Sequence, residues 1–167
     1  MSNFRSPTVI DWITAIEFSL NSTAISTRLI SMAASLYIVV EGEDPGFDIF
    51  VNGQALARNE DALERLAERL HVTPLLEFFS ADENSMALLL EQGVASPDWA
   101  RHLPRPQWYG AADGMLTVCA LIEFLTANPA ALGSETQPVM VELREYERVL
   151  GKTAERGLHW HIAVSWR

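Results

Sequence analysis

The sequence predicts an α+β fold, in which a small sheet of three or four strands is packed by about four or five helices. Two β-rich runs, LYIVVEGED and FDIFV, lie in the first third of the chain and are separated by a Pro-Gly pair. Segments with apolar residues at helical spacing follow. The chain closes on LHWHIAVSW, in which apolar residues alternate. Strands at both ends with helices between them are typical of the α+β class.

An N-terminal hairpin is the first expected element, with strands at residues 36–41 and 47–51. Proline presets φ at the first central position of a tight turn, and glycine supplies the positive φ at the second. The pair Pro45-Gly46 therefore predicts the turn between the two strands. The Asn-Gly pair that follows FDIFV is a second hairpin signal, and it predicts a short returning strand at 54–56.

Capping residues and apolar spacing predict the helices. Asn59 is placed to cap the first of them, and Thr73-Pro74 to open a short second one. The expected helical segments are residues 60–70, residues 75–79, a segment from the cap Asp82 to Gly93, residues 112–127 and residues 138–156.

The last two helices carry the most apolar residues. The helix at 112–127 is nearly all apolar and is expected to be central, with Cys119 on its buried stripe. The helix at 138–156 is expected to end at Gly157, a residue suited to positive φ. Its expected inward side chains are Val139, Leu143, Tyr146 and Leu150.

The closing strand, residues 158–166, is expected to be a core strand. Side chains alternate along a strand, so the two tryptophans and the aliphatic residues share one face and the two histidines share the other. We expect this strand to pair with the first strand of the hairpin, and we expect Trp160 and Ile162 to be buried.

The composition describes a globular chain with one main domain. Residues 1–31 are expected to form an extension, partly helical at 9–20, before a single domain at 32–167. No apolar run reaches the length needed to cross a membrane. One cysteine excludes an internal disulfide, and charged residues interrupt any secretory signal near the N-terminus, so a cytoplasmic location is expected.

The net charge of −10 is concentrated in one region. Residues 32–91 contain twelve acidic and three basic residues, a net charge of −9. Such a region repels a nucleic-acid backbone and attracts a basic protein. The binding residues that the sequence suggests are these acids together with two tryptophans of the proline-rich loop at 93–110: Glu41, Glu43, Asp44, Asp48, Glu60, Glu64, Trp99 and Trp108.

The two strand histidines, His159 and His161, are the candidate metal ligands. Two imidazoles on one strand face can chelate a single ion, but zinc needs a third protein ligand, and the sequence signals none. We therefore expect no tightly bound metal and no cofactor. The sequence contains no phosphate-binding glycine loop, nucleophile elbow, HExxH or CxxC motif, and we assign no catalytic residue.

Two resemblances follow from these segments. The stretch from SLYIVVEGEDPGFDIFVNGQALARNEDALERLAERLHV to GLHWHIAVSW, residues 35–166, resembles a family of small bacterial proteins of unknown function. The VNGQALARNEDALERLAERLHV segment, with its late helix and final strand, is similar in pattern to barstar-like ribonuclease inhibitors, acidic proteins that cover a basic nuclease. The chain lacks the aromatic-glycine-acid stretch of the inhibitors' binding helix, so no functional residue is carried over.

The leading hypothesis is a non-enzymatic acidic protein that binds a basic protein, as an inhibitor-like, immunity-like or regulatory factor. One alternative is a metal-dependent enzyme centred on His159 and His161. Another is a structural subunit of a homo-oligomer.

Overall fold

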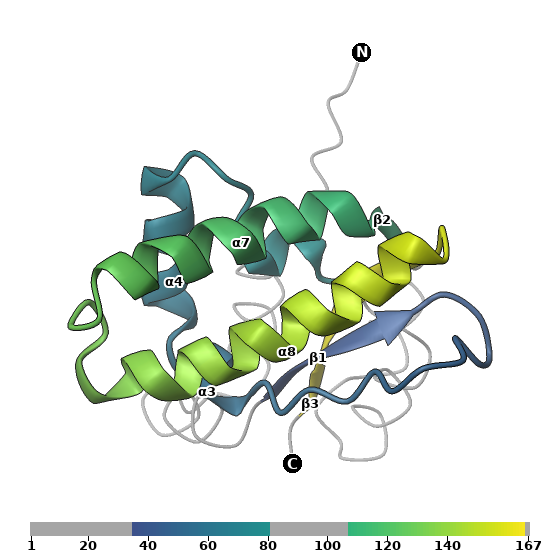
Figure 1. Cartoon of the computed structure of the whole chain (residues 1–167), viewed down its shortest axis with the longest axis horizontal. Helices are drawn as coiled ribbons and strands as arrows, with labels where there is room; N and C mark the ends of the chain where they lie inside the picture. The colour runs from purple at the N-terminus through teal and green to yellow at the C-terminus, as the bar shows by residue number, and fades with distance from the viewer. Residues whose placement is uncertain (1–34, 81–106, 166–167) are drawn as a thin grey trace, which may run out of the picture.

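The computed structural model describes residues 35–80 and 107–165, and Figure 1 shows how they are arranged. These residues form an α+β fold, as the sequence predicts. In chain order the elements are β1 (Ser35–Val40), α3 (Gln54–Arg58), α4 (Glu60–Arg69), the 3-10 turn η1 (Leu75–Phe78), β2 (Tyr109–Gly110), α7 (Ala111–Ala127), the 3-10 turn η2 (Gly133–Glu135), α8 (Thr136–Glu155) and β3 (His159–Ser165).

The three described strands form one antiparallel sheet in the order β1-β3-β2. The closing strand β3 lies in the centre and pairs with β1 in the register Ile38↔Ile162, which confirms the predicted pairing. The short strand β2 pairs with the start of β3. The β-branched and aromatic residues of β1 and β3 suit a sheet whose inner face is buried.

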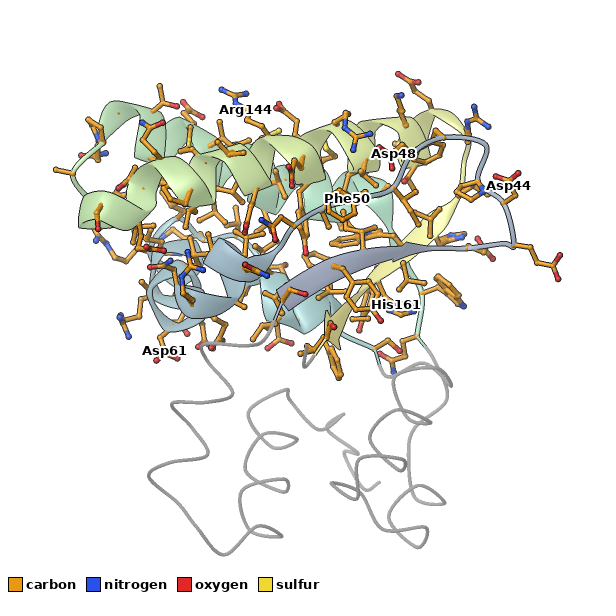
Figure 2. The ribbon with its side chains drawn as sticks, turned by 90° about the horizontal axis from the view of Figure 1, so that it is seen from below. Asp44, Asp48, Phe50, Asp61, Arg144 and His161 are labelled. Atoms are coloured by element: carbon orange, nitrogen blue, oxygen red, sulfur yellow. The ribbon has the colours of Figure 1, made fainter. Side chains whose placement is uncertain are left out.

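The inner face of the sheet packs against α7 and α8, which lie side by side as a helical layer (Figures 1 and 2). Trp160 and Ile162 are fully buried, as predicted. The indole of Trp160 lies against Gly114 of α7, where a Cβ atom would come within 2.3 Å of the ring carbon Cζ2. A side chain at position 114 would therefore push the helix away from the sheet.

The apolar stripe of α8 is confirmed, whereas that of α7 is rotated from the prediction. The inward positions of α8 are all fully buried: Val139, Leu143, Tyr146 and Leu150. On α7, Val118, Leu121 and Leu125 are buried, but Cys119 is exposed. Because nearly every residue of α7 is apolar, the sequence marks its buried side only weakly.

The predicted hairpin is wrong in its second half. Residues 47–51 belong to no strand, and residues 54–56 lie in helix α3. The turn glycines do have the expected conformation, with φ of 75° at Gly46 and 69° at Gly53. A backbone hydrogen bond, from Leu36 N–H to the Gly53 carbonyl at 3.0 Å, joins β1 to the predicted turn that follows residues 47–51.

Several predictions fall outside the described residues: the extension at 1–31, the helix after Asp82, and the positions of Trp99 and Trp166. Within the described ranges, no helix combines the length and the apolar character needed to cross a membrane.

Candidate functional site

Residues 41–53, which we call the 41–53 segment, lie along α8 and are fixed there by side chains of that helix and of the residue that follows it (Figure 2). Arg156, directly after α8, donates a hydrogen bond to the Pro45 carbonyl at 2.7 Å. Arg148 donates to two carbonyls, those of Asp48 at 2.8 Å and Phe50 at 3.1 Å. These guanidinium groups satisfy backbone acceptors that a neighbouring strand would satisfy in a hairpin.

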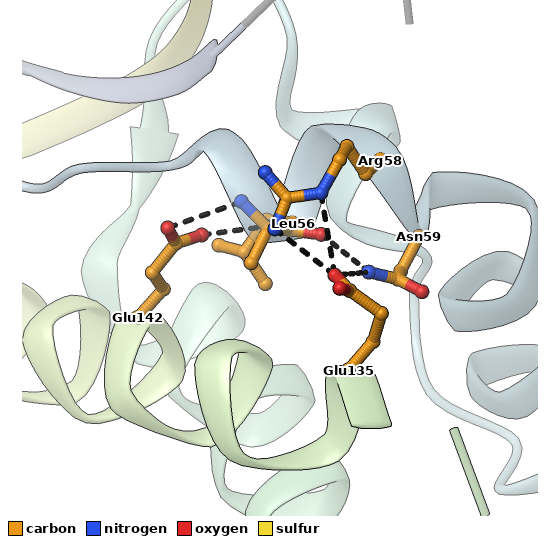
Figure 3. A network of polar contacts seen from close by, with 6 residues as sticks. Leu56, Arg58, Asn59, Glu135 and Glu142 are labelled. Atoms are coloured by element: carbon orange, nitrogen blue, oxygen red, sulfur yellow. Dashed lines mark hydrogen bonds and ion pairs between the residues drawn. The ribbon is translucent and has the colours of Figure 1, made fainter. Parts of the chain in front are cut away.

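Two carboxylates of α8 bind the backbone at the end of the segment and in the first turn of α3, and Figure 3 shows the second of these contacts. Glu145 accepts the N–H of Asn52 at 3.0 Å. The buried Glu142 accepts the N–H groups of Ala55 at 3.1 Å and Leu56 at 2.8 Å. These amides lie in the first turn of α3, where backbone donors lack partners within the helix and negative charge is favourable.

A third carboxylate, Glu135, joins the end of α3 to α8 (Figure 3). It accepts hydrogen bonds from Asn59 Nδ2 and Arg58 Nη2, both at 3.0 Å, and these bonds lower the pKa of Glu135. Asn59 occupies the predicted cap position of α4, but its side chain donates to the carbonyl of Ala55 instead of capping α4.

Two of the predicted binding acids are fixed by local hydrogen bonds. The Oδ1 atom of Asp44 accepts the N–H of Gly46 at 2.7 Å, and that of Asp48 accepts the N–H of Phe50 at 2.9 Å. In each case the carboxylate bonds a backbone N–H two residues later, as in an Asx turn. Both residues remain exposed, as does Glu43. The segment therefore presents three carboxylates to solvent.

Glu41 has a different environment, at the junction of β1 and β3. One carboxylate oxygen contacts His159 Nδ1 at 2.8 Å and accepts the His159 N–H at 3.2 Å. The hydrogen bond with the imidazole, followed by that from the backbone, lowers the pKa of Glu41. This pair ties the start of the 41–53 segment to the central strand.

The remaining predicted acids, Glu60 and Glu64, lie elsewhere. With Asp61 they bring carboxylate oxygens within 4.8 Å of one another at the start of α4. Burial, followed by the neighbouring negative charges of Asp61 and Glu64, raises the pKa of Glu60 to about 7. Figure 2 shows Asp44 and Asp61 at opposite ends of the molecule. The predicted acids therefore form two separate groups instead of one surface.

The strand histidines also have different environments. His159 is half exposed and paired with Glu41, whereas His161 is buried, with the ring of Trp108 centred 4.8 Å away. In the part of the chain that the structure describes, the group of three potential metal ligands within reach of one another is the acidic one on α4, and it includes neither histidine. Trp108 itself remains partly exposed.

Phe50 and the polar residues of α8 are features that the sequence analysis did not identify. Phe50 is 70% exposed, although its neighbour Val51 is buried. Alternation through FDIFV places Asp48 and Phe50 on one side of the segment, and this pattern could have marked the phenylalanine as a surface residue. The contacts of Glu142 and Arg148 have no comparable signal, because they join residues far apart in the sequence.

Comparison with known proteins gives no further assignment: no family model, no curated protein and no solved structure matches this chain significantly.

Proposed function

We propose that this chain is a non-enzymatic binding protein that engages a basic protein partner through the acidic part of the 41–53 segment. The observation that carries the proposal is that Glu43, Asp44 and Asp48 are exposed to solvent on a backbone segment that is held in place. All three are exposed, and α8 fixes the backbone that bears them. An inhibitor-like, immunity-like or regulatory role is consistent with such a surface.

The fixed backbone supports the proposal energetically. Binding costs free energy when a flexible loop must become ordered, and a segment that is already held in place avoids much of that cost. Arg148 and Arg156 bond to backbone carbonyls, so they hold the segment while its carboxylates point to solvent. The charge of −9 over residues 32–91 adds a longer-range attraction for a basic protein.

The electrostatic part of the proposal has a direct test. Partners are isolated from a lysate of the source organism, purified, and measured for association rate at low and high salt. The test variant removes three charges through Glu43→Gln, Asp44→Asn and Asp48→Asn. The asparagines keep the side-chain oxygens that accept the backbone N–H groups. A matched control removes three exposed charges elsewhere, through Glu68→Gln, Glu77→Gln and Glu123→Gln.

We expect a basic partner whose association rate at low salt falls at least tenfold in the test variant, since complementary charges act mainly on the association rate. The control should change the rate by less than about threefold. The proposal fails if no basic partner binds, or if the two variants and the two salt concentrations give equal rates.

A further inference from the structure

Phe50 lies on the same segment as Glu43, Asp44 and Asp48, and both of its backbone polar groups are hydrogen-bonded. Its N–H donates to Asp48 Oδ1 at 2.9 Å, and its carbonyl accepts from Arg148 at 3.1 Å. A rotation of the backbone that turned the side chain away from solvent would break both hydrogen bonds. The ring nevertheless remains 70% exposed.

A second phenylalanine of the same segment shows that exposure is not general there. Phe47 is partly buried, and the guanidinium of Arg156 lies 5.3 Å from the centre of its ring. Among the described residues, no aromatic or cationic group covers Phe50 in this way. The segment therefore covers one aromatic side chain and leaves the other in water.

We infer that Phe50 is the apolar anchor of the docking surface, and that it inserts into an apolar recess rimmed by basic residues on the partner protein. This inference rests on the proposed function. Charge complementarity identifies the occupant, because Glu43, Asp44 and Asp48 are exposed on the same segment as the ring. The nearby Arg148 and Arg156 direct their guanidinium groups to backbone carbonyls of that segment. A central aromatic side chain with polar neighbours is the usual composition of an interface hot spot.

The anchor and the acids affect different rate constants. Charged residues at the rim of an interface act mainly on association and on its salt dependence, whereas a buried aromatic anchor acts on dissociation. Replacing Phe50 should therefore leave the salt-dependent association rate nearly unchanged while the complex dissociates faster. This separation allows the anchor to be tested apart from the electrostatic attraction.

The first step of the experiment uses the full chain with the photo-crosslinking residue p-benzoylphenylalanine in place of Phe50. The control carries the same residue in place of Leu116 on α7, which is 68% exposed. Each protein is irradiated in a lysate of the source organism, and crosslinked proteins are identified by mass spectrometry. We expect a basic protein to be captured from position 50 and not from position 116.

The second step measures the captured protein, once purified, against Phe50→Ala and Leu116→Ala. We expect Phe50→Ala to raise the dissociation rate at least tenfold with an association rate within about threefold of the wild type. Leu116→Ala should change neither rate. Circular dichroism and thermal melting check that both variants are folded.

Three results would overturn the assignment of Phe50 as the anchor. One is a crosslink from position 50 to a second copy of this chain, and another is a crosslink to lipid alone. The third is a salt-dependent complex that Phe50→Ala leaves unchanged, which removes the anchor but preserves the proposed function. If no basic protein binds the wild-type chain at any salt concentration, both proposals fail together.

Discussion

The strand pair β1–β3 and the 41–53 segment are neighbours in the chain, yet they are held in opposite ways. Between β1 and β3 the backbone forms the hydrogen bonds and the side chains fill the core. In the 41–53 segment the backbone is bonded by side chains of α8, and several of its own side chains point to solvent. A β-rich sequence thus becomes a paired strand only where another strand provides the backbone partners.

Trp160→Ala should cause the largest change, because it disrupts the part held by backbone pairing and core packing. The buried indole fills the space beside Gly114, and its loss should lower the free energy of unfolding by about 3–5 kcal/mol. Urea denaturation measures the change. Trp108→Ala, at a partly exposed position, serves as the control and should cost clearly less. Equal losses would show that the core does not depend on the central strand as described.

Glu142→Gln tests the buried contact between α8 and the first turn of α3. A glutamine can accept only one of the two N–H groups and turns a donor toward the other, so stability should fall by about 1–3 kcal/mol. Glu155→Gln, on the same helix at an exposed position, is the control and should be nearly neutral. If Glu142→Gln were as stable as the wild type, the carboxylate would not be what holds α3.

Arg148→Ala should loosen the 41–53 segment with only a modest effect on the whole fold. The carbonyls of Asp48 and Phe50 lose an exposed hydrogen-bond donor, and we expect the free energy of unfolding to fall by about 1 kcal/mol. Hydrogen exchange should become faster at the N–H groups of Phe50 and Asn52, but not in β3. Arg144→Ala is the matched control, since the exposed Arg144 pairs with the partly exposed Glu147 on the same helix. Unchanged exchange in the segment would contradict its attachment through Arg148.

The smallest expected effect is a pH dependence at Glu41, where the two regions meet. Because the His159 hydrogen bonds lower the pKa of Glu41 below 4.5, the folded chain binds this proton less tightly than the unfolded chain does. The resulting stabilisation is present above about pH 4.5 and is lost as the pH falls through the lowered value. Carboxyl NMR titration should show the pKa of Glu41 rising toward 4.5 in His159→Asn. The same pKa in both proteins would rule out this pairing in solution.

The same contrast explains what could be predicted from the sequence. Burial of Trp160 and the inward stripe of α8 follow from simple periodicity, and the structure confirms both. The turn glycines were identified correctly, but Gly53 precedes helix α3 instead of turning a hairpin. A Cβ atom at that position would come within 1.7 Å of the Leu36 carbonyl oxygen, a tertiary contact that no local pattern contains.

The candidate site could be predicted only in part, for a related reason. The sequence identifies the acidic residues, and it is the fold that places Asp44 and Asp61 at opposite ends of the molecule. Arg148 and Glu142 look like ordinary polar residues of an amphipathic helix. They matter because they bond to backbone groups that lie 100 and 86 residues away in the sequence. Contacts between such distant residues leave no periodic pattern.

The attachment of the 41–53 segment to α8 also sets an order of events during protein synthesis. The sequence separations in these contacts range from 93 residues, between Asn52 and Glu145, to 111 residues, between Pro45 and Arg156. At about 5–20 residues per second, the ribosome adds the later partner roughly 5–22 seconds after the earlier one. Until then the early β-rich residues have neither α8 nor β3 to bind. The nascent chain is therefore most exposed to misassociation during this interval, and the fold is completed only when its last elements have been made.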